Sequence, residues 1–199
     1  MEFTLYEKEK LKEKSTWSSR FVKAAIIQMV LAALVTGVLV LAQLGPLNLL
    51  SFVMSYKTAD TTYAGTWVNF GYIMYIIGVL AIGLTATFYR YFESNISIRN
   101  TKLTNIFASI HLLLMNIGIV IASWMMMIAG YIGGVAQMSI EWGGTGMDAM
   151  KVHESIFQTL VPLGVTNWVE IGILLAVVGI LSGSLGLFIQ LTRKKEEVK

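Results

Sequence analysis

Four long runs of apolar residues, separated by polar segments, dominate the pattern along this chain of 199 residues. Each run is longer than the roughly 20 residues that a helix needs to cross about 30 Å of hydrocarbon. A helix also pairs its own backbone polar groups, as a segment in lipid must. We therefore predict an all-α polytopic membrane protein, a single membrane domain whose four transmembrane helices form an up-down bundle or arc. The predicted spans are about 22–44, 67–89, 106–131 and 167–191.

The composition narrows the chemistry that the chain can carry. It is 55% hydrophobic and 14% charged, and it has no cysteine, which excludes disulfides, thiolate metal sites and thiol nucleophiles. The net charge of +3 would suggest nucleic acid in a soluble protein. In residues 1–20, however, lysines alternate with glutamates that nearly cancel them. We expect membrane lipids as partners and no nucleic acid.

The basic residues predict how the chain crosses the membrane. Of the 15 Lys and Arg residues, 13 lie before the first span or at its starting edge, between the second and third spans, or after the fourth. Only Lys57 and Lys151 lie in the other two loops. Because cytoplasmic loops carry the excess of Lys and Arg, both termini are predicted to be cytoplasmic. Residues 1–20 then form a charged cytoplasmic segment, and residues 192–199 a cytoplasmic tail.

The two loops on the opposite side are the longer ones, at about 45–66 and 132–166. The second contains a glycine-rich turn region and then a short apolar stretch, 156–163. This stretch is too short to span, so we predict that it lies in the membrane interface before Pro162–Gly164 turns the chain into the last span. The aromatic residues near the span ends predict an outer belt of Trp67, Trp142 and Trp168 and an inner belt of Tyr89, Tyr91 and Phe92.

A stripe of small residues follows one face of the fourth span. Small residues let helices approach closely in lipid, where no hydrophobic force drives association. Two interpretations stay open: the stripe packs against another helix of this chain, or it docks to a different subunit. The stripe consists of Gly172, Ala176, Gly179, Gly183 and Gly186, with spacings of four and three residues, and the third span adds Gly118 and Ala122.

The two histidines predict that the chain holds no haem between two of its own imidazoles. His111 lies within the third span and His153 lies in the loop on the opposite side of the membrane. We therefore expect no catalytic residue and no metal site in this chain. A histidine within a span is usually a structural residue that forms a hydrogen bond to a neighbour, and we expect this of His111. Because ionisable residues at membrane depth are costly, His111 also stays a weak candidate for cofactor binding or a proton path.

Other polar side chains at membrane depth are few. Glu170, near the outer end of the fourth span, is the only acid in any predicted span. It is either an interfacial group that reaches water or a carboxylate in a proton route. Asn116 and Gln28 are expected to form hydrogen bonds between helices.

The third span resembles a helix of a known family. Residues 111–119 read HLLLMNIGI, and an apolar run then leads through Trp124 to Gly130, Gly133 and Gly134. This pattern resembles the penultimate helix of subunit I of the haem–copper oxidases, in the cbb3-type and nitric-oxide-reductase-like branch. The loop with His153 and the glycine-rich last helix resemble the loop and final helix that come next in that family, so that the resemblance covers about 95 residues.

The departures from that family determine what the resemblance implies. Leu112 and Leu113 stand where the family has aromatic residues after the histidine, and 67–89 contains no histidine ligand for a haem. The resemblance therefore implies a haem-free relative of the C-terminal helices that packs against other subunits. It implies no cofactor bound by this chain alone, with haem or copper in partner subunits.

The leading hypothesis is a non-catalytic, haem-free integral membrane subunit of a respiratory or energy-converting oxidoreductase complex in a prokaryotic plasma membrane. Its expected partners are other integral membrane subunits, with quinone as a further candidate. The alternative is a small oligomeric transporter or channel in which Glu170, His111 and the buried amides line a path. A third hypothesis is a haem or quinone enzyme that a partner chain completes.

Overall fold

The computed structural model describes residues 16–44, 53–54, 63–95 and 101–197. Over these residues the fold is helical without strands, and four of the helices are long and apolar enough to cross a membrane. This confirms the predicted all-α class with four apolar helices. The long helices are α2 (Thr16–Gln43), α4 (Thr66–Asn95), α5 (Lys102–Gln137) and α7 (Val165–Glu197).

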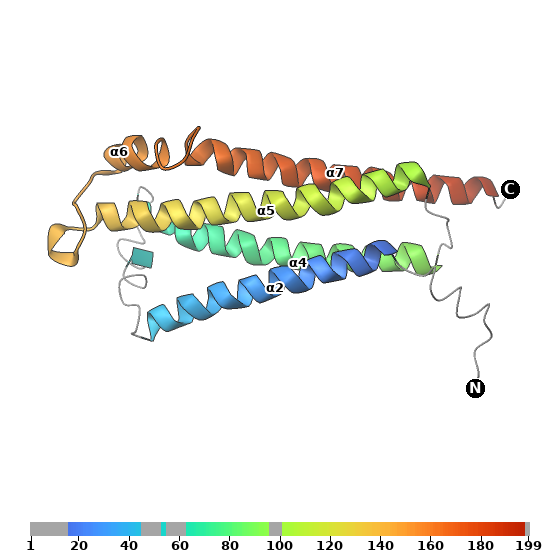
Figure 1. Ribbon diagram of the computed structural model, residues 1–199, viewed down its shortest axis with the longest axis horizontal. Helices are drawn as coiled ribbons and strands as arrows, with labels where there is room; N and C mark the ends of the chain where they lie inside the picture. The colour runs from blue at the N-terminus through green and yellow to red at the C-terminus, as the bar shows by residue number, and fades with distance from the viewer. Residues whose placement is uncertain (1–15, 45–52, 55–62, 96–100, 198–199) are drawn as a thin grey trace.

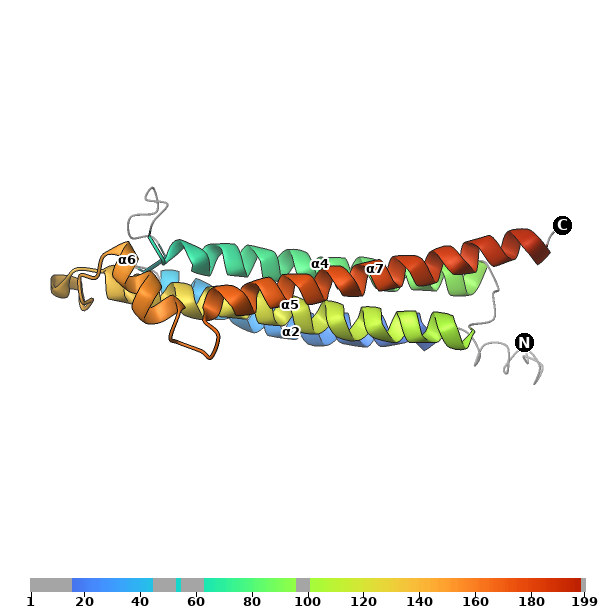
Figure 2. The same cartoon turned by 90° about the horizontal axis from the view of Figure 1, so that it is seen from above.

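The four long helices alternate in direction along the bundle (Figure 1). α5 lies between α4 and α7, and α2 packs mainly against α4 with only slight contact to α5. Because each helix packs chiefly on the long helix next to it in the chain, the arrangement is an open row and not a closed bundle. Figure 2 shows the same helices from above, with α4 toward one side and α5 and α2 toward the other. The first turn of α2 and the last turn of α7 lie at the same end (Figure 1).

The helices extend beyond most of the predicted span limits. α5 begins four residues earlier and ends six residues later than the predicted 106–131, and α7 continues through Glu197 into the predicted tail. α2 begins at Thr16, inside the predicted charged segment, and ends at Gln43, one residue before the predicted limit. α7 ends in a run of Arg, Lys and Glu, which are good helix formers, so this helix does not stop where its apolar run stops. α5 instead continues through Gly133 and Gly134, where packing against close neighbours accompanies the helix. Residues 1–15 and 198–199 lie outside the described residues.

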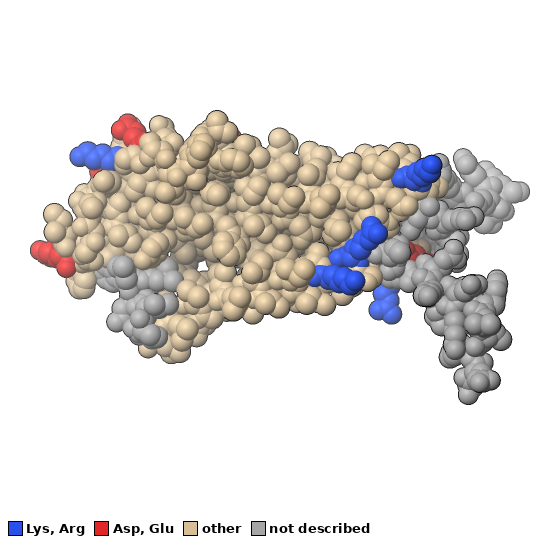
Figure 3. All heavy atoms as spheres, viewed as in Figure 1, with Lys and Arg blue, Asp and Glu red and all other residues tan. Residues whose placement is uncertain are grey.

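The outward faces of the long helices are apolar. Large aliphatic and aromatic side chains are exposed along each of them, including Val30 on α2, Phe70 on α4, Leu113 on α5 and Leu181 on α7. Such a surface would be costly in water but matches hydrocarbon chains. The described lysines and arginines lie toward the ends of the bundle, as the visible face in Figure 3 illustrates.

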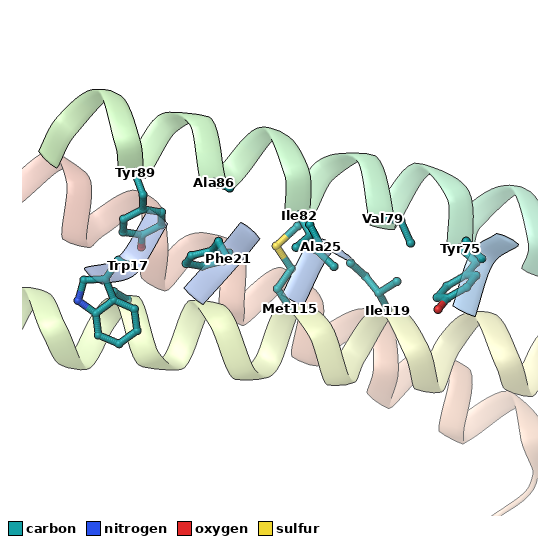
Figure 4. Packing of buried hydrophobic residues seen from close by; sticks show 12 residues of the cluster. Trp17, Phe21, Ala25, Tyr75, Val79, Ile82, Ala86, Tyr89, Met115 and Ile119 are labelled. Carbon is teal, nitrogen blue, oxygen red and sulfur yellow. The ribbon is translucent and has the colours of Figure 1, made fainter. Parts of the chain in front are cut away.

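Buried positions repeat with heptad spacing, which determines how the helices pack. On α4 the buried face consists of Tyr75, Val79, Ile82, Ala86 and Tyr89, at alternating intervals of four and three residues. A seam of this kind is typical of left-handed packing of membrane helices, with crossing angles of about 20°. Figure 4 shows this face meeting side chains of α2 and α5, among them Phe21, Met115 and Ile119.

The first turn of α2 is fastened to its neighbours by polar contacts. The Glu93 carboxylate of α4 accepts hydrogen bonds from the backbone N–H groups of Trp17 (2.8 Å) and Ser18 (3.4 Å). These N–H groups have no partner within their own helix, and the carboxylate also complements the positive end of the helix dipole. The Trp17 indole N–H donates to the Asn105 side chain of α5 at 2.7 Å, and the Arg20 guanidinium lies 4.3 Å from the Trp17 ring centroid. Contacts to α4 and α5 therefore hold this end of α2.

A second packed cluster lies at the opposite end of the bundle. There α5 continues to Gln137, and the chain then forms the short segments η1 (Ile140–Trp142), α6 (Ala149–Val152) and η2 (His153–Phe157). The glycines of α5 permit close packing here: a Cβ on Gly133 would lie 2.9 Å from that of Ala64, and one on Gly134 would lie 2.9 Å from the Cα of Gly65. With 36 residues, α5 is about 54 Å long and exceeds the hydrocarbon thickness, so this cluster caps the membrane part of the protein.

Candidate functional site

His111 on α5 is in contact with each of the other three long helices. Its side chain is buried, and its Nδ1 atom is 3.3 Å from the Tyr89 hydroxyl of α4, with which it shares a hydrogen bond. The Phe21 ring of α2 lies edge-on to the imidazole, with ring centroids 5.0 Å apart. From α7, Gly183 presents its backbone to the same ring. One residue of α5 thus contacts α2, α4 and α7.

The sequence permits this junction because Gly183 has no side chain. A Cβ atom at that position would overlap the His111 ring. On the other side, Phe21 stacks on Tyr89 with ring centroids 4.8 Å apart and an interplanar angle of 15°. The imidazole is therefore enclosed by two aromatic rings and a helix backbone. In this arrangement it can share a proton with Tyr89 across the hydrogen bond.

A second set of hydrogen-bonded polar side chains lies nearer the middle of the spans, between α2, α4 and α5. The Tyr75 hydroxyl of α4 donates to the Gln28 side-chain oxygen of α2 at 2.6 Å. The Gln28 amide in turn lies 3.4 Å from the Asn116 side-chain oxygen of α5, and Asn116 donates to the backbone oxygen of Leu112 at 2.7 Å. This chain of hydrogen bonds joins α4, α2 and α5. Its groups satisfy one another in a region where water is excluded.

Removing the Tyr75 hydroxyl tests this chain of hydrogen bonds. We expect Tyr75→Phe to lower the free energy of unfolding by about 1 kcal/mol, because Gln28 loses its buried donor and hydrogen bonds between membrane helices contribute about that much. The measurement is unfolding of the purified chain in mixed micelles. Tyr91→Phe is the matched control, since Tyr91 is exposed. Equal stability of the two variants would contradict the assigned hydrogen bond.

The small-residue stripe of α7 faces α5 of the same chain. A Cβ on Gly172 would lie 2.7 Å from the backbone nitrogen of Ala122, and one on Gly179 would lie 2.7 Å from that of Met115. A Cβ on Gly118 would overlap the backbone of α7 at Gly172 and Ala176, and one on Gly186 would lie 3.0 Å from the Phe107 Cβ. Of the two interpretations left open by the sequence, the structure therefore supports packing within the chain.

The remaining predicted site residues lie apart from this junction. Glu170 is exposed in the second turn of α7, at the end of the bundle that carries η1, α6 and η2. His111 is buried toward the opposite end. His153 is exposed in η2, with Phe157 as its ring neighbour at 6.3 Å. Over the described ranges, no three His, Asp or Glu side chains come close enough to hold a metal ion. The structure thus places His111 against Gly183 and Asn116 against Gln28, whereas Glu170 lies apart from both pairs.

Sequence reasoning missed the partners of these polar residues. Phe21 and Tyr75 were not singled out, and Tyr89 was placed in an aromatic belt, although it is buried against His111. A signal for the tyrosines was available, because Tyr75, Ile82 and Tyr89 recur every seven residues on α4. Such a repeat predicts a buried seam, and polar residues within a seam are expected to face one another.

Comparison with known proteins yields no relative. No protein-family model, no curated protein and no solved structure matches the chain. The resemblance to haem–copper oxidases therefore gains no support from these comparisons and rests on the sequence pattern of the third span, the loop after it and the last helix.

Proposed function

We propose that this chain is a non-catalytic, haem-free integral membrane subunit of a respiratory or other energy-converting oxidoreductase complex, similar to a terminal oxidase. The observation that carries the proposal is that the histidine and amide side chains of the interior form hydrogen bonds to neighbouring helices. His111 is engaged with Tyr89, and Gln28 with Tyr75 and Asn116. Such groups contribute to a fixed arrangement of helices, which is what a supporting subunit needs.

The link to an oxidoreductase comes from the third span. The order of His111, Ile117-Gly118 and the glycines at 130, 133 and 134 resembles the penultimate helix of haem–copper oxidase subunit I. The enclosure of His111 by Phe21, Tyr89 and Gly183 supports the haem-free form of that proposal. Any haem or copper would belong to partner subunits.

The proposed orientation in the membrane rests on the charges. We place the chain in a prokaryotic plasma membrane as a multi-pass protein with both termini in the cytoplasm. The asymmetry of 13 against two basic residues supports this orientation. The first turn of α2 and the last of α7 lie at one end of the bundle, as the proposal requires (Figure 1). The lipid-facing sides of the helices leave room for other integral membrane subunits and for quinone.

A transporter or channel has less support. Many transporters bind their substrate where spanning helices are interrupted, whereas α2, α4, α5 and α7 are each continuous. Glu170 and His111, the ionisable residues expected along a path, lie toward opposite ends of the bundle. The buried amides between them are bonded to side chains of neighbouring helices.

Native purification tests the proposal. An affinity-tagged copy of the full chain is extracted from the source membrane in mild detergent, and the proteins that accompany it are identified by mass spectrometry. Membranes with an untagged chain serve as the control. We expect haem- or copper-bearing oxidoreductase subunits in a fixed ratio to the chain. Recovery of the chain alone or as a homo-oligomer would overturn the proposal and direct the next test to transport.

A further inference from the structure

A turn before α7 presents apolar side chains outward. Leu160, Pro162 and Leu163 are exposed, with 69% of the Leu163 surface accessible. Between them, Val161 packs against the buried cluster at this end of the bundle. Val161 thus packs inward, whereas the side chains of Leu160, Pro162 and Leu163 remain exposed.

The backbone of this turn is satisfied within the chain. The carbonyl oxygen of Pro162 accepts the Trp168 indole N–H at 2.6 Å, and that of Leu163 accepts the Asn167 side-chain amide at 2.5 Å. The Gly164 N–H donates to the carbonyl oxygen of Val161 at 3.0 Å. Exposed carbonyls normally bond to water, so side-chain donors at two consecutive carbonyls suit a place with little water.

The same bonds hold the turn beside the first turn of α7, where the apolar span Val165–Thr192 begins. The Pro162 carbonyl is bonded to the indole of Trp168, a residue that precedes Glu170 by two positions on α7. Exposed large apolar residues follow on α7 from Ile173. The headgroup layer adds about 5–7 Å on each side of the hydrocarbon. Figure 2 shows the turn standing out sideways from the bundle beside the start of α7.

Leu163 also has a backbone conformation that is unusual for its type. Its φ angle is +72°, in the left-handed region that favours glycine, and Gly164 follows with φ of +82°. A bulky residue there costs about 1–2 kcal/mol. Since its side chain is largely exposed, contacts within the chain do little to offset that cost. Contact with lipid would offset it.

We propose that the turn Leu160–Gly164 is an interfacial anchor that inserts Leu160, Pro162 and Leu163 among the lipid headgroups and upper acyl chains next to α7. The anchor would fix the depth of the first turn of α7, together with Trp168. The tip of the protein provides a contrast. The segment η1 follows the end of α5 and lies beyond the level of the turn (Figure 1), and its Ile140 is exposed. On this placement Trp142, which also lies in η1, stands outside the outer belt predicted for it from the sequence.

The test uses the absence of cysteine from the natural chain. Single variants Leu163→Cys, Ile140→Cys and Leu181→Cys are labelled with an environment-sensitive fluorophore and placed in lipid nanodiscs. Aqueous iodide and lipids carrying a nitroxide at the headgroup or deep in the acyl chain then act as quenchers. Leu181, exposed on α7 well within the apolar run, marks the hydrocarbon, and Ile140 marks the aqueous phase.

We expect the label at position 163 to be quenched most by the headgroup nitroxide and to be several-fold less accessible to iodide than the label at 140. Equal iodide quenching at 163 and 140, or protection at 163 from both iodide and lipid nitroxides, would overturn the anchor. Leu160→Cys repeats the test with the unusual Leu163 backbone left intact. The isolated chain is used throughout, so the result does not depend on the oxidoreductase proposal.

Discussion

Replacing Gly118 with alanine is expected to lower the free energy of unfolding by about 3 kcal/mol, at the upper end of the usual cost of overpacking. The added methyl group would overlap the carbonyl oxygen of Gly172 and the backbone nitrogen of Ala176. These are backbone atoms of a continuous helix, so they cannot rotate aside as a side chain would. α7 as a whole must move away from α5, and the close contacts along the stripe are lost together.

Two other glycines of the long helices provide controls for this prediction. A Cβ atom on Gly37 in α2 or on Gly83 in α4 would have no neighbouring atom within 4 Å. Alanine is favoured over glycine in helices by about 1 kcal/mol, so Gly37→Ala and Gly83→Ala should leave stability unchanged or raise it slightly. Thermal unfolding of all three variants in the same detergent separates the cases. If Gly118→Ala unfolds at the temperature of the controls, α5 and α7 do not pack as described.

His111→Ala is expected to have the second-largest effect, a loss of about 2 kcal/mol. The substitution removes the side chain that contacts α2, α4 and α7 at once, and it leaves a cavity that three helices cannot fill without moving. Tyr89→Phe removes only the hydrogen bond to the imidazole, so its cost should be smaller, below about 1 kcal/mol. Comparison of the two variants separates packing from hydrogen bonding at this junction.

The other histidine offers the matched control. His153 is exposed in η2, outside the long helices, so His153→Ala should leave unfolding unchanged. Both histidine variants are compared with the natural chain by unfolding in mixed micelles. Equal stability of His111→Ala and His153→Ala would show that the four helices do not depend on the buried imidazole.

The four apolar helices could be predicted because hydrocarbon thickness sets a minimum length for an apolar run. Their ends could not, because the lipid boundary does not stop a helix: α7 continues through charged residues to Glu197. Good helix formers without a breaker simply extend the hydrogen-bonded backbone into water.

The partners of the site residues were harder to predict than the residues themselves. The stripe on α7 indicated close approach by some helix, but small residues carry no information about which helix approaches. Only the structure pairs Gly172 with Gly118 and Ala122. Likewise, Tyr89 near a span end could face lipid headgroups or the interior, and the rotation of α4 about its axis decides between them. That rotation depends on packing against α5, which involves residues far apart in the sequence.

The optical spectrum of the chain produced alone in haem-replete cells tests the central claim most directly. If His111 serves only to join helices, the purified chain has no Soret band and folds without haem. A Soret band that disappears in His111→Ala but persists in His153→Ala would contradict that claim. It would instead support a haem enzyme that a partner chain completes.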